Sequence, residues 1–145
     1  MADLAGIAQR FDVVRGVLEE RSRRLVAAAE SVAAGRGGVS VVARATGMSR
    51  QVIRQGLREL AEQNLAKAHY LASGLAARFK SPFFNEFVVR VGDPEALNKK
   101  LLKKKVIGGL ALGRFYPELA DCMLLCATEM TKRESMDIVR QAVQG

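Results

Sequence analysis

The feature that most constrains this chain is a long stretch without proline, Ser49 to Arg78, whose apolar residues recur with the period of an α-helix. Successive apolar residues are three, four or one positions apart, which places them on one helical face. They are Ile53, Leu57, Leu60, Ala61, Leu65, Ala68, Leu71, Ala72 and Leu75. Ser49 is a typical N-cap residue. Gly56 and Gly74 each weaken a helix by about 1 kcal/mol relative to alanine, so the helix can bend or break at either. One buried helix of a single domain fits this pattern, but we favour a helix that ends one module and begins another.

The basic residues change in kind along the chain. Residues 1–63 contain ten Arg and no Lys, whereas residues 64–145 contain eight Lys and five Arg. This change suggests two segments of different origin that meet near residue 63. With 145 residues, enough for one domain or two small ones, we predict an α+β chain in which a helical module over 1–60 is joined by the long helix to a small α/β domain over 61–145.

Composition also limits the location and the chemistry. No apolar run approaches the roughly 18 residues of a membrane span, and the early charges Asp3, Arg10 and Asp12 are unlike a signal peptide. Cys122 and Cys126 have no His or Cys companions at the spacing of a zinc site. We therefore expect a cytoplasmic protein with reduced, buried, structural cysteines, no metal site and no membrane partner.

The N-terminal part is expected to be helical. Residues 3–34 form a helix in one or two pieces, which the glycines of 35–38 end. Its expected apolar face contains Ile7, Phe11, Val14, Val17, Leu18, Leu25, Val26 and Ala29.

The following segment, 39–60, predicts a helix-turn-helix, in which the second helix enters the major groove of DNA. Ser40 begins a short helix through Thr46, Gly47 forms the turn with a positive φ, and Ser49 caps the second helix. The inward positions are Val42, Ala43, Ile53 and Leu57.

Residues on the outward face of the second helix are of kinds that bind DNA. Arginine can form two hydrogen bonds with guanine, and glutamine can form two with adenine. The net charge of +8 favours binding to a polyanion. The predicted DNA-binding residues are Ser49, Arg50, Gln51, Arg54 and Arg58, with Gln55 beside them and Arg36 and Arg44 as phosphate contacts. The alternative is a solvated face of a small helical bundle.

The segment 18–60 resembles the N-terminal segment of bacterial insertion-sequence transposases, through its ERSRRL, GRGGVSVVARATG and SRQVIRQGLREL blocks. That family continues into a nuclease domain with acidic metal ligands. Nothing downstream in this chain continues that pattern, so the resemblance implies only the DNA-contacting helix.

The C-terminal part predicts a small α/β layer. We expect a strand over 85–91, a helix over 92–105 that Asp93 caps, short apolar pieces over 106–119, and a buried strand over 121–130. A last helix follows Thr131, with Glu134 completing a capping box. The apolar sides of the two helices are Ala96, Leu97, Leu101 and Leu102 in the first, and Met136, Ile138, Val139 and Ala142 in the second.

Residues 61–143 resemble the C-terminal end of glycine dehydrogenase (decarboxylating) subunit 1, the P-protein of the glycine cleavage system. Four blocks in order carry the match: AEQNLAKAHYLASGLA, SPFFNEFVVRV, VIGGLALGRFYPEL and LLCATEMTKRESMD. The resemblance implies the small C-terminal domain of a fold-type I pyridoxal-phosphate enzyme. It also implies subunit 2, which holds the Schiff-base lysine, and a lipoyl carrier protein as partners.

Most of the family's machinery cannot be assigned in this chain. We assign no Schiff-base lysine, pyridinium partner or phosphate cup, so we expect no cofactor on this chain alone. Arg114 is a candidate for a substrate carboxylate, with a structural salt bridge as the alternative. We interpret the lysines of 99–105 as a solvated helix end, His69 as a packing or surface residue, and Gly108, Gly109 and Gly113 as unrelated to a phosphate loop.

The sequence thus predicts a fragment of the glycine cleavage P-protein that is inactive alone. The alternatives are a DNA-binding protein derived from a transposase and a folded relic with neither activity.

Overall fold

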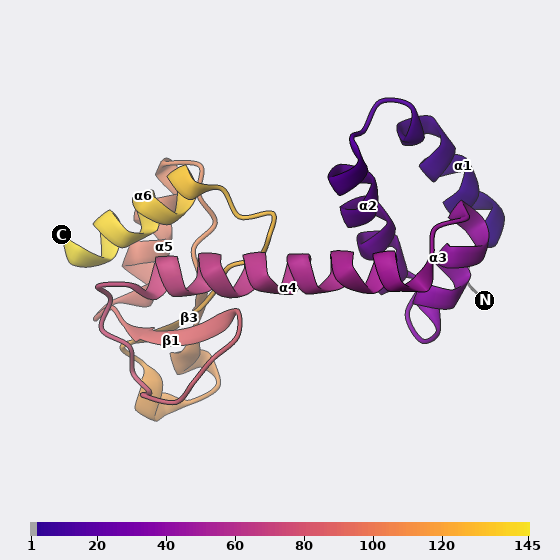
Figure 1. Cartoon of the computed structure of the whole chain (residues 1–145). Coiled ribbons are helices and arrows are strands. Elements are labelled where there is room, and N and C mark those ends of the chain that lie inside the picture. Colours follow the sequence, from indigo (N-terminus) through magenta and orange to yellow (C-terminus); the bar gives the residue numbers. More distant parts are fainter. Residues whose placement is uncertain (1–2) are drawn as a thin grey trace. The chain divides into compact units, whose positions relative to one another are not determined.

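The computed structural model describes residues 3–145, and its contacts divide the chain into two compact units, Met1–Glu62 and Gln63–Gly145. The division falls within helix α4, Arg50–Ala72 (Figure 1). The architecture is α+β, helix-rich with a small sheet in the second unit. Among residues 3–145 no helix is both long and apolar enough to cross a membrane.

The first unit is entirely helical. It contains α1 (Leu4–Arg15), α2 (Glu20–Ala33), α3 (Gly38–Thr46) and the first half of α4. Its core consists of Ile7, Phe11, Ala27, Val42 and Ile53.

The helix expected over residues 3–34 is thus two helices, and its predicted apolar face is partly wrong. Val17 lies in the connection between them and is 84% exposed, and Ala29 is also exposed. Ala27 and Ala28 are fully buried instead. The buried side of α2 is formed by alanines, whose small side chains contribute little to the apolar periodicity from which the sequence analysis placed the buried face.

Gly56 does not bend α4, as the sequence had suggested it can. A Cβ at this position would lie 2.6 Å from the backbone oxygen of Arg24 and 2.9 Å from Cβ of Ala28. The glycine therefore allows α2 and α4 to cross at very short range.

Helix α3 begins at Gly38 with Gly37 as its N-cap, so the predicted start of this helix at Ser40 is wrong. The turn between α3 and α4 forms as the sequence predicts. Gly47 has φ +73° and its N–H donates to the carbonyl of Ala43. The Ser49 hydroxyl accepts a hydrogen bond from the N–H of Val52 at 3.2 Å, so it caps α4. The hydroxyl of Thr46 donates to the carbonyl of Val42 and accepts from the N–H of Met48, which fixes the connection further.

Helix α4 ends at Ala72, six residues before its predicted end at Arg78. Gly74, with φ +79°, lies just beyond the last turn. The chain then runs extended beside the first strand, since the N–H of Arg78 donates to the carbonyl of Val88 at 2.8 Å. Glycine at this point ends a helix because it adopts a positive φ without strain.

The second unit contains a three-stranded antiparallel sheet in the order β1-β3-β2. The strands are β1 (Glu86–Arg90), β2 (Leu110–Ala111) and β3 (Cys122–Cys126). The other elements are α5 (Pro94–Lys103), α6 (Arg133–Gln144) and the 3-10 turns η1 (Leu112–Arg114) and η2 (Pro117–Leu119).

One face of this sheet forms the core of the second unit together with three helices. The sheet contributes Phe87, Val89, Met123 and Leu125. The helices contribute Ala68 and Leu71 of α4, Leu97 and Leu101 of α5, and Met136, Val139 and Ala142 of α6.

Several details predicted for this unit are wrong. The strand expected over 121–130 ends at Cys126, which is exposed rather than buried. Thr131 does not cap α6, because its hydroxyl accepts from the N–H of Thr128 and the helix begins only after Lys132. Leu102 is 67% exposed, so the apolar side of α5 is narrower than predicted.

Candidate functional sites

The residues predicted to contact DNA share the exposed side of the first half of α4. Ser49, Arg50, Gln51, Arg54 and Arg58 are all exposed. Within residues 3–145, none of these three arginines forms an ion pair. Their charges therefore face solvent without a carboxylate to neutralise them.

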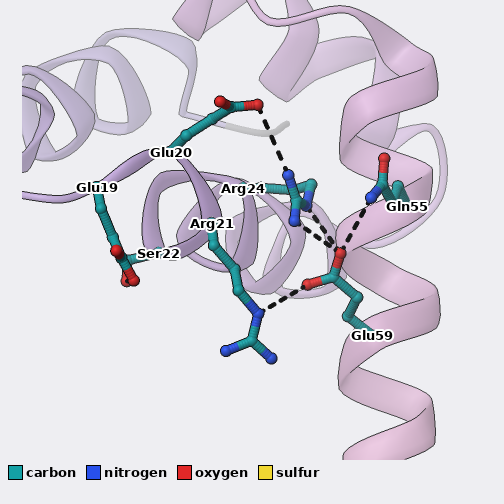
Figure 2. Close-up of polar contacts among 7 residues, drawn as sticks. All are labelled: Glu19, Glu20, Arg21, Ser22, Arg24, Gln55 and Glu59. Carbon is teal, nitrogen blue, oxygen red and sulfur yellow. Dashed lines mark hydrogen bonds and ion pairs between the residues drawn. The ribbon is translucent and has the colours of Figure 1, made fainter.

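Gln55 belongs to a different cluster, a polar network that joins α2 to α4 (Figure 2). The carboxylate of Glu59 accepts hydrogen bonds from the guanidinium of Arg24, at 3.0 and 2.8 Å, and from the amide of Gln55 at 3.2 Å. Arg21 lies 3.4 Å from the second carboxylate oxygen.

The sequence analysis did not identify the Arg24–Glu59 pair. The Arg24 side chain is only 13% exposed. The two residues are 35 positions apart, so no local spacing could reveal the pair. Arg50, Arg54 and Arg58 take no part in this network.

Arg114, the candidate for a substrate carboxylate, lies exposed on η1. It lines a hollow of about 500 Å³ together with Asp93 and Glu95. No ion pair of Arg114 is found in the part of the chain that the structure describes, so the expected salt bridge is not present there. Its guanidinium lies 6.0 Å from the ring centroid of Phe115.

The residues of this chain do not fit a pyridoxal-phosphate site. Lys67 and Tyr70 line a hollow of about 650 Å³, but the polar atoms of both side chains are already bound within the protein. The Lys67 ammonium donates to the carbonyl of Glu129, and the Tyr70 hydroxyl donates to the carboxylate of Asp137. The other seven lysines are exposed: Lys80, Lys99, Lys100, Lys103, Lys104, Lys105 and Lys132. No lysine among residues 3–145 is desolvated as a Schiff-base lysine requires.

The remaining candidate groups are structural. Burial, and next a hydrogen bond to Asp121, raises the pKa of the Cys122 thiol. Partial desolvation, and next the negative charge of Glu86, raises the pKa of the Cys126 thiol, although this residue is exposed. Both thiols therefore stay protonated and weakly nucleophilic at neutral pH. His69 is exposed and stacks on Phe83, with ring centroids 4.5 Å apart. Residues 3–145 contain no cluster of three metal-binding side chains.

Comparison with known proteins identifies relatives for part of the chain, although no family model matches it. A probable glycine dehydrogenase (decarboxylating) subunit 1 from Solibacter usitatus is 74% identical over 86 residues, which cover 58% of this chain and 19% of that protein. Part of this chain is homologous to glycine dehydrogenase subunit 1. The counterparts from Anoxybacillus flavithermus and Koribacter versatilis are 48% and 47% identical, over 58% and 62% of this chain.

The chain spans about a fifth of the length of these relatives. A crystal structure of glycine decarboxylase (P-protein) of the glycine cleavage system, in inhibitor-bound form, is similar in fold, with a TM-score of 0.51 and 24% identity. The similarity covers 69% of this chain and 27% of that one. These comparisons support a C-terminal part of subunit 1, and none of the relatives named here is a transposase.

Proposed function

We propose that residues 61–145 are the C-terminal domain of a subunit 1 of glycine dehydrogenase and that this chain alone does not decarboxylate glycine. The 74% identity to the Solibacter usitatus protein carries the proposal. The matched stretch is only 19% of that relative's length, which supports the lack of activity. In the resembled family, pyridoxal phosphate supplies the decarboxylation chemistry, and subunit 2 and a lipoyl carrier protein complete the system.

A chimera tests the domain assignment. Residues 61–145 of this chain replace the matched stretch of the Solibacter usitatus subunit 1, and the product is combined with that organism's subunit 2, pyridoxal phosphate and lipoyl carrier protein. We expect carbon dioxide release from glycine close to that of the unaltered enzyme, because the two proteins are 74% identical over the matched stretch. An inactive or insoluble chimera would contradict the assignment.

The same assay tests the lack of activity. This chain with subunit 2, pyridoxal phosphate and carrier protein is expected to release no more carbon dioxide than a mixture without the chain. A clear increase would refute this part of the proposal.

The Arg114→Ala change in the chimera tests whether Arg114 binds the substrate carboxylate. If it does, the change should raise the KM for glycine.

A second candidate function is binding to DNA through the first half of α4, as in a helix-turn-helix derived from a transposase. The exposed, unpaired arginines Arg50, Arg54 and Arg58 favour it, as does the preceding turn at Gly47. Arginines at the N-terminal part of a helix can reach base edges and phosphates in the major groove.

Binding of the full chain to duplex DNA tests this function. The association constant should fall steeply with salt concentration, and Arg54→Ala should weaken binding about tenfold or more. Arg15→Ala is the matched control, since Arg15 is an exposed arginine of the same unit on α1. No binding at low salt would rule the function out.

The change from arginine to lysine near residue 63 supports a different origin for the two parts of the chain. In that case the first part derives from a mobile element that joined a glycine dehydrogenase gene. The flanking genomic DNA tests this history, because it should show an insertion boundary at the codons near residue 60.

A further inference from the structure

Five lysines form a dense positive surface at the end of α5, called the lysine patch below: Lys99, Lys100, Lys103, Lys104 and Lys105. All five are exposed, and within residues 3–145 none of them forms an ion pair. Residues 96–117 contain no Asp or Glu. The chain itself therefore leaves the charges of the patch without neutralising carboxylates.

The solvated helix end expected from the sequence explains only part of this cluster. Positive side chains in the last turn of a helix are stabilised by the negative end of the helix dipole. However, like charges three or four positions apart on a helix repel each other, and Lys99 and Lys100 stand in this relation to Lys103. An anion bound beside the helix would relieve this repulsion.

Lys105 has an unusual backbone conformation. Its φ is +59°, and among the residues that the structure describes it is the only residue other than glycine with a positive φ. It lies just beyond the end of α5, where the N–H of Val106 donates to the carbonyl of Leu101 at 3.1 Å, a position that glycine usually occupies. A side chain in this conformation is strained, and strain of this kind is concentrated where a side chain serves a function.

The chemistry of the patch fits the phosphates of a nucleic-acid duplex. Residues 99–105 rise about 9 Å along a helix axis, which gives one positive charge per about 2 Å, close to the one phosphate charge per about 1.7 Å of duplex DNA. Lysine contacts phosphates without reading the bases. Residues 96–107 contain no aromatic side chain on which an unpaired base could stack. A double strand is therefore a better match than a single strand.

We propose that the lysine patch is a nucleic-acid surface that binds the phosphate backbone of a duplex without sequence preference. It belongs to the second unit and shares no residue with Arg50, Arg54 and Arg58 of the first. It therefore does not depend on the DNA-binding function proposed for α4. If both surfaces bind one duplex, their covalent connection raises the affinity of the chain.

Binding of the full chain to a duplex of about 20 base pairs, measured between about 50 and 200 mM salt, tests the patch. Lys103→Gln combined with Lys104→Gln should reduce the slope of log K against log salt concentration by about 2, and weaken binding at low salt about tenfold or more. The matched control is Lys80→Gln combined with Lys132→Gln. It removes the same charge from two exposed lysines of the same unit and should change the slope little.

Lys105→Gly separates binding from stability. Glycine adopts the positive φ without strain, so this change should leave the melting temperature unchanged or higher. It should nevertheless reduce the salt slope by about 1, because one phosphate contact is lost. A full slope in Lys105→Gly would contradict a role for this side chain in binding.

The outcomes separate this proposal from the one for α4. If the lysine changes affect the slope no more than the control pair does, the patch is refuted, whereas weaker binding in Arg54→Ala would still support α4. Loss of slope in the lysine variants without an effect of Arg54→Ala supports the patch and refutes α4. No binding to the duplex at low salt refutes both.

Two further probes test the class of partner. A single strand of the same length should bind less tightly than the duplex, and tighter binding that the lysine changes abolish would contradict the duplex as partner. Leu102 and Ile107 are also exposed beside the patch, but two apolar side chains bury less area than one acyl chain, which itself gives only marginal membrane binding. Binding to vesicles of phosphatidylcholine and phosphatidylglycerol, in a chain that does not bind the duplex, would show that the partner is a membrane surface and the proposal is wrong.

Discussion

Replacing Gly56 with alanine sets two effects of opposite sign against each other. In an isolated helix the change stabilises by about 1 kcal/mol, because alanine has the higher helix propensity. In this chain the new methyl carbon would lie 2.6 Å from the carbonyl oxygen of Arg24, which belongs to the backbone of α2 and cannot rotate away. The two helices would have to separate.

The steric effect should be the larger one. Extra methyl groups in a tightly packed site cost about 1–3 kcal/mol. Separation would also stretch the bond between Arg24 and Glu59, now 2.8 Å long. After the gain in helix propensity of about 1 kcal/mol is subtracted, we expect the free energy of unfolding of the first unit to fall by up to about 2 kcal/mol.

Hydrogen exchange of the full chain measures this change in the first unit alone. The slowest amides of this unit, expected around the buried residues Val42 and Ile53, should exchange faster in Gly56→Ala, by a factor of up to about 30. The matched control is Gly16→Ala, because Gly16 has φ −81° and nothing lies within 4 Å of its added carbon. That change should be neutral or stabilise by about 0.4–1 kcal/mol. Equal or greater protection in Gly56→Ala would refute the close crossing.

Two further predictions concern ion pairs of the first unit. Glu59→Gln leaves the largely buried guanidinium of Arg24 without its carboxylate, so it should destabilise this unit by about 1–3 kcal/mol, measured by the same exchange experiment. A hydrogen bond from Arg10 lowers the pKa of Glu30 below its usual value, so the carboxylate stabilises the folded state at neutral pH. This contribution should be lost as the pH falls through the folded-state pKa of Glu30, and Arg10→Gln should reduce the loss of stability in an acid titration by this contribution.

The sequence predicted those elements whose signals are local. The turn at Gly47 and the caps at Ser49 and Asp93 form as expected, because each depends on a few neighbouring residues. The end of α4 was placed too late, since the helical spacing continues through Leu75 while the chain from Ala76 pairs with β1. Gly74, which the sequence marked as a possible break, ends the helix with its positive φ, and pairing with β1 fixes the extended chain that follows.

The candidate sites show the same limit. Exposure of Arg50, Arg54 and Arg58 follows from helical periodicity alone, so the sequence was sufficient to place them. Contacts between distant segments, such as Arg24 with Glu59, required the structure. The apolar stripe of α4 is continuous in the sequence, but its residues pack into two separate cores. Ile53 belongs to the core of the first unit and Leu71 to the core of the second.

The blocks that resemble subunit 1 consist largely of residues that build the fold. Phe87 and Val89 of the second block, and Leu125 and Ala127 of the fourth, are buried in the core. In the third block, Gly109 is not part of a phosphate loop: an added Cβ would collide with the carbonyl oxygen of Leu124, so close packing of the chain against β3 requires glycine. This packing is needed for the fold whether or not the attached polypeptide performs catalysis. High identity in this domain therefore supports descent and fold, whereas activity depends on the residues that the remaining four fifths of the relatives supply.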